Sequence, residues 1–125
     1  MAKNIPRAQW KQFCDQFTRQ HEGWLVTVTD VSDQKTRPNA SGTAQASTHV
    51  VARDLRLKRI TAEREGNDLE LRIVAGDGSK RVTHFVLDPA RIQLEQTRYG
   101  TDWGLRLDAK DDRTTLMRFQ VPMLS

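Results

Sequence analysis

The feature that most constrains the fold is a series of short β-prone segments separated by turn-forming residues from Val50 onward. The separating segments are Glu65-Gly66-Asn67-Asp68, Gly76-Asp77-Gly78-Ser79, Asp88-Pro89 and Tyr99-Gly100-Thr101-Asp102. We expect strands near residues 53–65, 68–75, 80–87, 91–97, 102–109 and 114–120. Such regular spacing is typical of an antiparallel meander, a small barrel or a sandwich.

A helix is predicted upstream of these strands, over residues 6–21. Its apolar residues recur at helical spacing and form one stripe: Trp10, Phe13, Cys14 and Phe17. Pro6 suits a first helical turn, and Gly23 can end the helix in a left-handed conformation. We expect the apolar stripe to pack on the sheet and Cys14 to be a small buried hydrophobic residue.

The whole chain, residues 1–125, is predicted to be a single domain of the α+β class. Residues 24–31 alternate and are rich in β-branched side chains, so they are expected to form a first strand. Residues 33–48 are polar and small and predict a long loop, whereas residues 50–121 are strand-rich. The expected architecture is one N-terminal helix packed on an antiparallel sheet of six or seven strands.

The register of the last hairpin follows from charge. We expect Leu105 to lie opposite Met117, because the alternative register places Arg106 directly across from Arg118. The same register assigns Trp103 to the core. The turn between the two strands is expected at residues 110–112.

The segment Val82–Leu87 is apolar on both faces, which predicts a central strand covered on both sides. A four-residue turn that pairs Ala75 with Lys80 would place Leu71 opposite His84. His84 is therefore expected to be a core or half-core histidine with a hydrogen-bond partner.

No local motif in the sequence indicates catalysis or cofactor binding. The chain has 1 Cys and 3 His, and no two of the histidines have the short spacing of a metal motif. The segment from Gly76 to Lys80 lacks the spacing of a phosphate-binding loop and is better explained as a hairpin turn. We therefore expect no metal, no cofactor and no catalytic residues, and an enzyme is the least favoured class.

The charge distribution suggests a candidate contact surface. The formal net charge is +4, and residues 1–62 carry ten Lys/Arg against five Asp/Glu. The candidate surface residues are Arg53, Arg56, Lys58, Arg59, Arg98 and Tyr99. The basic cluster has two interpretations, a solvated edge strand protected by its charges or an anion-binding surface. With Arg98, Tyr99 and Trp103 around the glycine-containing turn it would suit nucleic acid, since guanidinium groups follow phosphates and aromatic rings stack on bases.

Three segments carry a resemblance to a known family: Ile5-Pro6-Arg7-Ala8-Gln9-Trp10, His21-Glu22-Gly23-Trp24, and the run from Leu105-Arg106-Leu107 to Thr114-Thr115-Leu116-Met117-Arg118-Phe119. With these segments the chain resembles a bacterial family known as domain of unknown function 5335. The resemblance covers most of the chain and implies no activity and no catalytic residues. The sequence departs from the family pattern at Lys110-Asp111-Asp112-Arg113 and in its long polar loop.

The predicted function is a non-enzymatic binding or interaction module. Edge strands and the 33–48 loop are the expected contact surfaces, for a protein partner or a second copy in a homodimer. The alternatives are a nucleic-acid-binding β-domain that uses the basic strand, and an enzyme with an unrecognised site. No membrane association is expected, and the N-terminal segment, which leads into the amphipathic helix, predicts a cytoplasmic protein.

Overall fold

A computed structural model describes residues 2–32, 47–65 and 68–120 of the chain. Its elements are β1 (Ala2–Ile5), the 3₁₀ turn η1 (Arg7–Gln9), α1 (Trp10–His21), β2 (Leu25–Ser32), β3 (Ser47–Glu65), β4 (Asp68–Ala75), the 3₁₀ turn η2 (Gly78–Lys80), β5 (Val82–Leu87), β6 (Pro89–Gln96), β7 (Asp102–Ala109) and β8 (Arg113–Phe119). The expected α+β fold, with an N-terminal helix on an antiparallel sheet, is confirmed. The described strands number eight rather than the six or seven expected, and the additional strand is the short β1.

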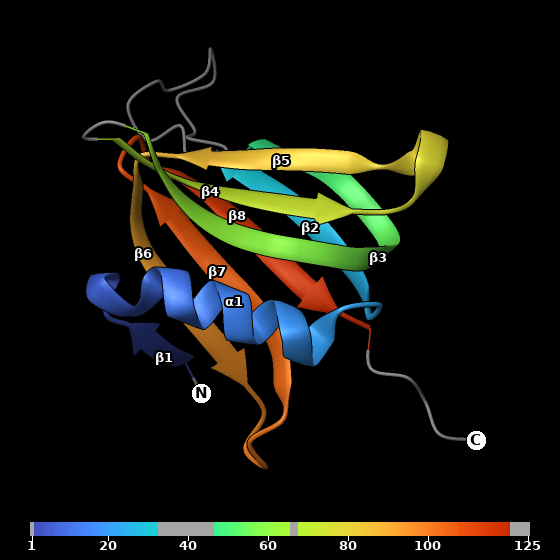
Figure 1. Cartoon of the computed structure of the whole chain (residues 1–125), viewed down its shortest axis with the longest axis horizontal. Coiled ribbons are helices and arrows are strands. Elements are labelled where there is room, and N and C mark those ends of the chain that lie inside the picture. Colours follow the sequence, from blue (N-terminus) through green and yellow to red (C-terminus); the bar gives the residue numbers. More distant parts are fainter. Residues whose placement is uncertain (1, 33–46, 66–67, 121–125) are drawn as a thin grey trace, which may run out of the picture.

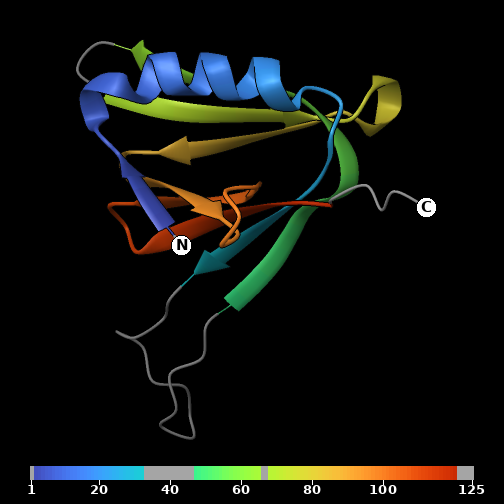
Figure 2. The same cartoon turned by 90° about the horizontal axis from the view of Figure 1, so that it is seen from below.

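The eight strands form one sheet in the order β1-β6-β7-β8-β2-β3-β4-β5, which folds over into two layers (Figure 1, Figure 2). The long β3 connects the layers: its first half pairs with β2 and its second half with β4. The pairing of β3 is irregular where the strand bends from one layer into the other. Asp54 in this part of the strand has a positive φ of 51°. The strand starts at Ser47, before the predicted start near residue 53, because its first residues are polar and were assigned to the loop.

The helix α1 lies beside the second half of β3 (Figure 2). It covers the layer that contains β6, β7, β8 and β2. Trp10, Cys14 and Phe17 are buried, as the apolar stripe predicted, and the Trp10 Nε1–H donates to the carbonyl oxygen of Ile5 at 2.9 Å. The predicted first turn of the helix is instead the 3₁₀ turn η1. Gly23 follows the helix with a φ of 89°, the left-handed conformation expected of it.

The register predicted for the last hairpin is confirmed, because Leu105 pairs with Met117. The assignment of Trp103 to the core was wrong. The pairing of β6 with β7 shifts by one residue at this point, so that Trp103 forms a bulge and is only partly buried. The guanidinium carbon of Arg118 lies 4.0 Å from the centroid of the Trp103 ring.

The central position predicted for β5 was also wrong, since β5 ends the strand order. Its Phe85 and Leu87 side chains are 45% and 63% exposed. The turn before β5 contains η2, so Ala75 pairs with Val82 instead of Lys80. This shift of two residues preserves the face of the strand, and His84 is half-buried as expected.

The side chain of Thr18 joins the helix to the strand beside it. The Thr18 hydroxyl accepts a hydrogen bond from the Ile60 N–H at 2.9 Å and donates to the Ile60 carbonyl at 3.1 Å. Both backbone groups of Ile60 therefore face the helix, and the side chain of Thr18 takes the place of a neighbouring strand.

Replacing Thr18 by valine should lower the free energy of unfolding by about 1–2 kcal/mol, because both Ile60 groups lose their partner. Thr18→Ser keeps the hydroxyl and should retain most of the stability. Urea denaturation of both variants is the measurement. Equal losses in the two variants would show that the hydroxyl contributes nothing.

In the described ranges, no helix is long and apolar enough to cross a membrane. Most of the predicted 33–48 loop lies outside the described residues, and its last residues belong to β3.

Candidate functional site

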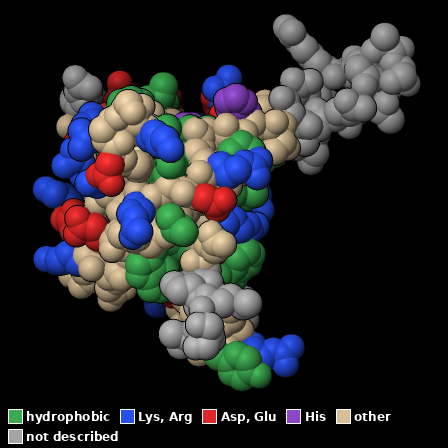
Figure 3. Space-filling model, turned by 90° about the vertical axis from the view of Figure 1, so that its right-hand side faces the viewer, with side chains coloured by type: hydrophobic (Ala, Val, Ile, Leu, Met, Phe, Trp, Pro, Cys, Tyr) green, Lys and Arg blue, Asp and Glu red, His purple; other side chains and the backbone are tan. Residues whose placement is uncertain are grey.

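Four of the predicted contact residues lie on β3, where the strand bends between the layers. Arg53, Arg56 and Arg59 are exposed, whereas the partly buried Lys58 forms an ion pair with Asp77. In the strand order β3 lies between β2 and β4, but each half of it pairs with only one of them, β2 up to Arg56 and β4 from Leu57 onward. The interpretation of the basic segment as a charged edge therefore stays a prediction. Lys and Arg side chains on this end of the molecule are interspersed with Asp and Glu (Figure 3).

The other two predicted contact residues, Arg98 and Tyr99, lie in the turn between β6 and β7. Both are exposed, and Tyr99 is 87% exposed. This turn extends at the bottom of Figure 1, apart from the bend of β3 at the right. The structure therefore does not bring the two groups together, and nucleic-acid binding by either of them stays a prediction.

His84 finds a hydrogen-bond partner across the layers, the Thr115 hydroxyl at 3.0 Å from its Nε2. Burial lowers the pKa of His84, although the Asp30 carboxylate opposes this shift. The adjoining cavity measures about 90 Å³, and Thr115 is only 3% exposed. A buried hydroxyl beside so small a cavity is accessible to very few substrates, so we assign this pair a structural role.

The remaining reactive side chain gives no active site either. Burial, with a contribution from the Asp15 carboxylate, raises the pKa of the Cys14 thiol to about 12. The thiol is therefore neutral and acts as a small hydrophobic group. Across the described ranges, no three His, Cys, Asp or Glu side chains are grouped closely enough to hold a metal ion.

A pocket of about 670 Å³ rich in arginine lies where β6, β7 and β8 meet the segment that leads into α1. We call it the arginine pocket. Its lining residues are Asn4, Ile5, Arg7, Trp10, Ala90, Arg91, Arg106, Asp108, Ala109, Asp112, Arg113 and Thr114. Four arginines thus face two aspartates, which gives the lining a net positive charge.

One carboxylate organises this pocket. Asp108 pairs across the sheet with Arg91 on one side and Thr114 on the other. Its Oδ2 accepts a hydrogen bond from Arg91 Nε at 2.9 Å, and its Oδ1 accepts one from Arg106 Nε at 3.1 Å. The Thr114 hydroxyl also donates to Oδ1, at 2.8 Å. The Asp108 side chain is only 12% exposed, so these bonds hold the two guanidinium groups against a fixed anchor.

The electrostatics of Asp108 agree with this arrangement. Its burial acts to raise its pKa, but the hydrogen bonds from Thr114 and Arg106 and the charge of Arg106 outweigh that effect. The pKa of Asp108 therefore lies below its usual range, and the group is ionised at neutral pH.

The two arginines keep free donors. Each uses Nε to bind Asp108, and its Nη groups form no hydrogen bond or ion pair with any residue that the structure describes. The planar end of a guanidinium presents two parallel N–H groups, which match two oxygens of a carboxylate or a phosphate. The arrangement can therefore bind an oxyanion with little reorganisation.

The sequence did not predict this pocket. Arg91 and Arg106 are far apart in the chain, and only the pairing of β6 with β7 places Arg91 opposite Asp108. The available signal was the alternation of Ile92 with Leu94 and of Leu105 with Leu107, which sets that register once the two strands are paired.

A family model described as "Family of unknown function (DUF5335)" matches residues 1–125. No curated protein and no solved structure matches the chain. The arginine pocket is thus interpreted from its own geometry.

Proposed function

Since the chain belongs to the family of unknown function DUF5335, we propose its role from its own surface: it is a non-enzymatic binding module. The arginine pocket takes up an oxyanion, a carboxylate or phosphate group, of the binding partner. The observation that carries this proposal is the pair of arginines, Arg91 and Arg106, that one buried carboxylate holds by their Nε atoms.

Preorganisation supports the proposal. A free arginine side chain loses rotamer freedom when it binds an anion, and this loss opposes binding. Here Asp108 already restricts Arg91 and Arg106, so a ligand meets donors that are in place. Arg7 and Arg113 add two further positive charges to the lining.

The composition of the pocket favours binding over catalysis. Its described lining contains four arginines, two aspartates, Trp10 and several apolar or uncharged polar side chains, but neither His nor Cys. Asp108 is ionised and bound by three donors, which makes it a poor proton acceptor. The pocket thus offers charge and hydrogen-bond donors rather than a nucleophile or a general base.

The test replaces both arginines by glutamine. We expect R91Q/R106Q to weaken phosphate binding at least tenfold, because each charged hydrogen bond contributes about 1.5–3 kcal/mol. Titration followed by NMR, with inorganic phosphate and separately with succinate, measures the affinity and tells a phosphate preference from a carboxylate preference.

The matched control is R53Q/R56Q, which makes the same change of charge at the bend of β3. This variant should bind both anions as the unsubstituted protein does, apart from a small effect of net charge. Equal weakening in the two double variants would show that only the overall charge attracts anions, and would overturn the proposal.

A further inference from the structure

We propose that an extended acidic peptide binds beside the arginine pocket by adding a strand to the free edge of β3 at residues Ala62 and Arg64. This inference rests on the proposed function, because it identifies the partner whose oxyanion enters the pocket. It starts from a groove of about 690 Å³ between the N-terminal half of α1 and the second half of β3.

The free edge follows from the hydrogen bonds of Ile60. In an antiparallel strand, the N–H and C=O of one residue point to the same side, and those of the next residue point to the other. Both groups of Ile60 bind Thr18 and therefore face the helix. The same groups of Ala62 and Arg64 must face that side too, away from β4.

The helix does not satisfy these next groups. Within the described residues, no hydrogen bond of the Thr18 kind reaches the helix-facing N–H and C=O of Ala62 and Arg64. Two N–H donors and two C=O acceptors are thus available along the groove. An added strand would satisfy them as it does in peptide recognition by β-strand addition.

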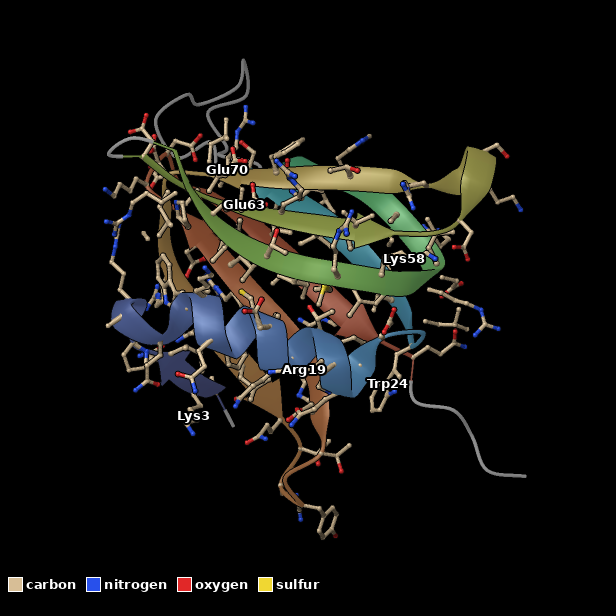
Figure 4. The ribbon with its side chains drawn as sticks, viewed as in Figure 1. Lys3, Arg19, Trp24, Lys58, Glu63 and Glu70 are labelled. Carbon is tan, nitrogen blue, oxygen red and sulfur yellow. The ribbon has the colours of Figure 1, made fainter. Side chains whose placement is uncertain are left out.

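The groove supplies further contacts. Its lining is Arg7, Ala8, Trp10, Lys11 and Asp15 from η1 and α1, Thr61, Ala62, Glu63 and Arg64 from β3, and Leu69 from β4. Glu63, labelled in Figure 4, forms an ion pair with Arg72 at 3.2 Å, so its negative charge is already compensated.

Charge identifies the occupant as acidic. Arg7 and Trp10 line both the groove and the arginine pocket, so the two hollows adjoin. With Lys11 and Arg64 the groove carries three positive charges against two negative ones, and the arginine pocket four against two. A peptide that pairs with β3 and extends past Arg7 would bring its carboxylates to the free arginine donors.

A second copy of the chain is a less favourable occupant. A twofold dimer that pairs two β3 edges would bring Arg7, Lys11 and Arg64 of both copies together. Like charges placed opposite each other on neighbouring strands destabilise the pairing. An acidic peptide removes this repulsion.

The experiment measures fluorescence anisotropy of a labelled peptide of about eight residues, alternating threonine and valine and ending in two aspartates. The control peptide ends in two lysines and should bind at least tenfold more weakly. Two further peptides carry N-methyl groups on alternate residues, in one frame or the other. One frame should lose binding and the other keep it, because only alternate N–H groups of an added strand face β3.

The protein variant that tests the edge is Ala62→Pro, with Ala62→Ser as its control. Proline removes the N–H that faces the groove and leaves the bonds to β4 intact, as at other strand edges. We expect at least tenfold weaker peptide binding by A62P and nearly unchanged binding by A62S. If A62P does not fold, hydrogen exchange in the unsubstituted protein replaces it: the Ala62 and Arg64 amides should become protected when the peptide is added.

The outcomes separate this inference from the proposed function. In one outcome, R91Q/R106Q weakens peptide binding, but A62P has no effect and both N-methylated peptides bind as the unmodified peptide does. This result would overturn strand addition and leave the arginine pocket as the binding site. Phosphate binding that R91Q/R106Q leaves unchanged would overturn the proposed function itself. In a third outcome, the protein self-associates without peptide and A62P abolishes this self-association. A second copy of the chain would then be the occupant of the edge, and the proposal of an acidic peptide would be overturned.

Discussion

Replacing His21 by alanine is expected to lower the free energy of unfolding by about 3–5 kcal/mol. His21 is 3% exposed and stacks on Phe119, with ring centroids 4.9 Å apart and an interplanar angle of 11°. Its Nδ1 donates to the Phe17 carbonyl at 2.8 Å, and its Nε2 lies 3.2 Å from Asp102 Oδ2. Alanine would leave a cavity among these rings and remove both polar contacts at once.

Chemical denaturation measures this loss, with two comparison variants. His21→Phe keeps an aromatic ring but removes the side-chain contacts to the Phe17 carbonyl and to Asp102 Oδ2. This variant should therefore lose less stability than alanine but still be destabilised. His49→Ala changes an exposed histidine and should alter the free energy of unfolding by no more than about 0.5 kcal/mol. A loss in H21A no greater than that in H49A would contradict the role given to the buried ring.

The sequence predicted those parts of the fold that depend on local periodicity. The stripe of Trp10, Cys14 and Phe17 faces the core because a helix returns to the same side at these spacings. The pairing of Leu105 with Met117 was predictable because one alternative placed two arginines opposite each other. In both cases the deciding interaction lies within one element or one hairpin.

Strand order was not predictable, because it depends on contacts between distant segments. The apolar pattern of Val82–Leu87 is the same whether a second layer covers both faces or only one. In the structure the outer face of β5 stays open, and the Arg72 guanidinium carbon lies 5.1 Å from the centroid of the Phe85 ring. Trp103 left the core for a related reason, since the bulge that turns it outward arises in the pairing with β6.

The arginine pocket could not be predicted for the same reason. In the sequence, Arg91, Arg106 and Asp108 look like the solvated polar positions of alternating strands. The pairing of β6 with β7 brings these side chains together, because it places the Asp108 carboxylate between two guanidinium groups. Basic residues that are close in the sequence, such as Arg56 and Arg59, instead remain exposed at the bend of β3.

Replacing Asp108 by asparagine should lower the free energy of unfolding by about 1.5–3 kcal/mol at neutral pH, because the buried carboxylate loses its charged hydrogen bonds while the half-exposed arginines keep part of their hydration. The substitution leaves Arg91 and Arg106 close together without the negative charge between them. The NH2 group of the asparagine side chain, itself a donor, would also replace one of the two acceptor oxygens. Asp112→Asn is the matched control, since it removes the same charge from an exposed position of the same pocket. The backbone φ of 66° at Asp112 is one that asparagine adopts readily.

The effect of Asp108→Asn should depend on pH. Because the folded protein holds the pKa of Asp108 below its usual value, its ionised form stabilises the fold at pH values above that usual value, near 3.9. This contribution is lost as the pH falls through the lowered pKa of the folded state. Urea denaturation at several pH values should therefore show the gap between D108N and the unsubstituted protein narrowing under acid conditions. A gap that stays constant down to about pH 2 would contradict the stabilising charge.

Anion binding by the same two variants distinguishes charge from position. Both substitutions make the pocket more positive by one charge, so an effect of charge alone would strengthen phosphate binding in each. If Asp108 holds Arg91 and Arg106 in place, D108N should instead bind phosphate about tenfold more weakly, whereas D112N should bind it as well or slightly better. Phosphate titrations of the folded variants, followed by NMR, give the comparison. Tighter binding by D108N would mean that the carboxylate merely competes with the ligand for the two arginines, and the preorganised pocket would have to be abandoned.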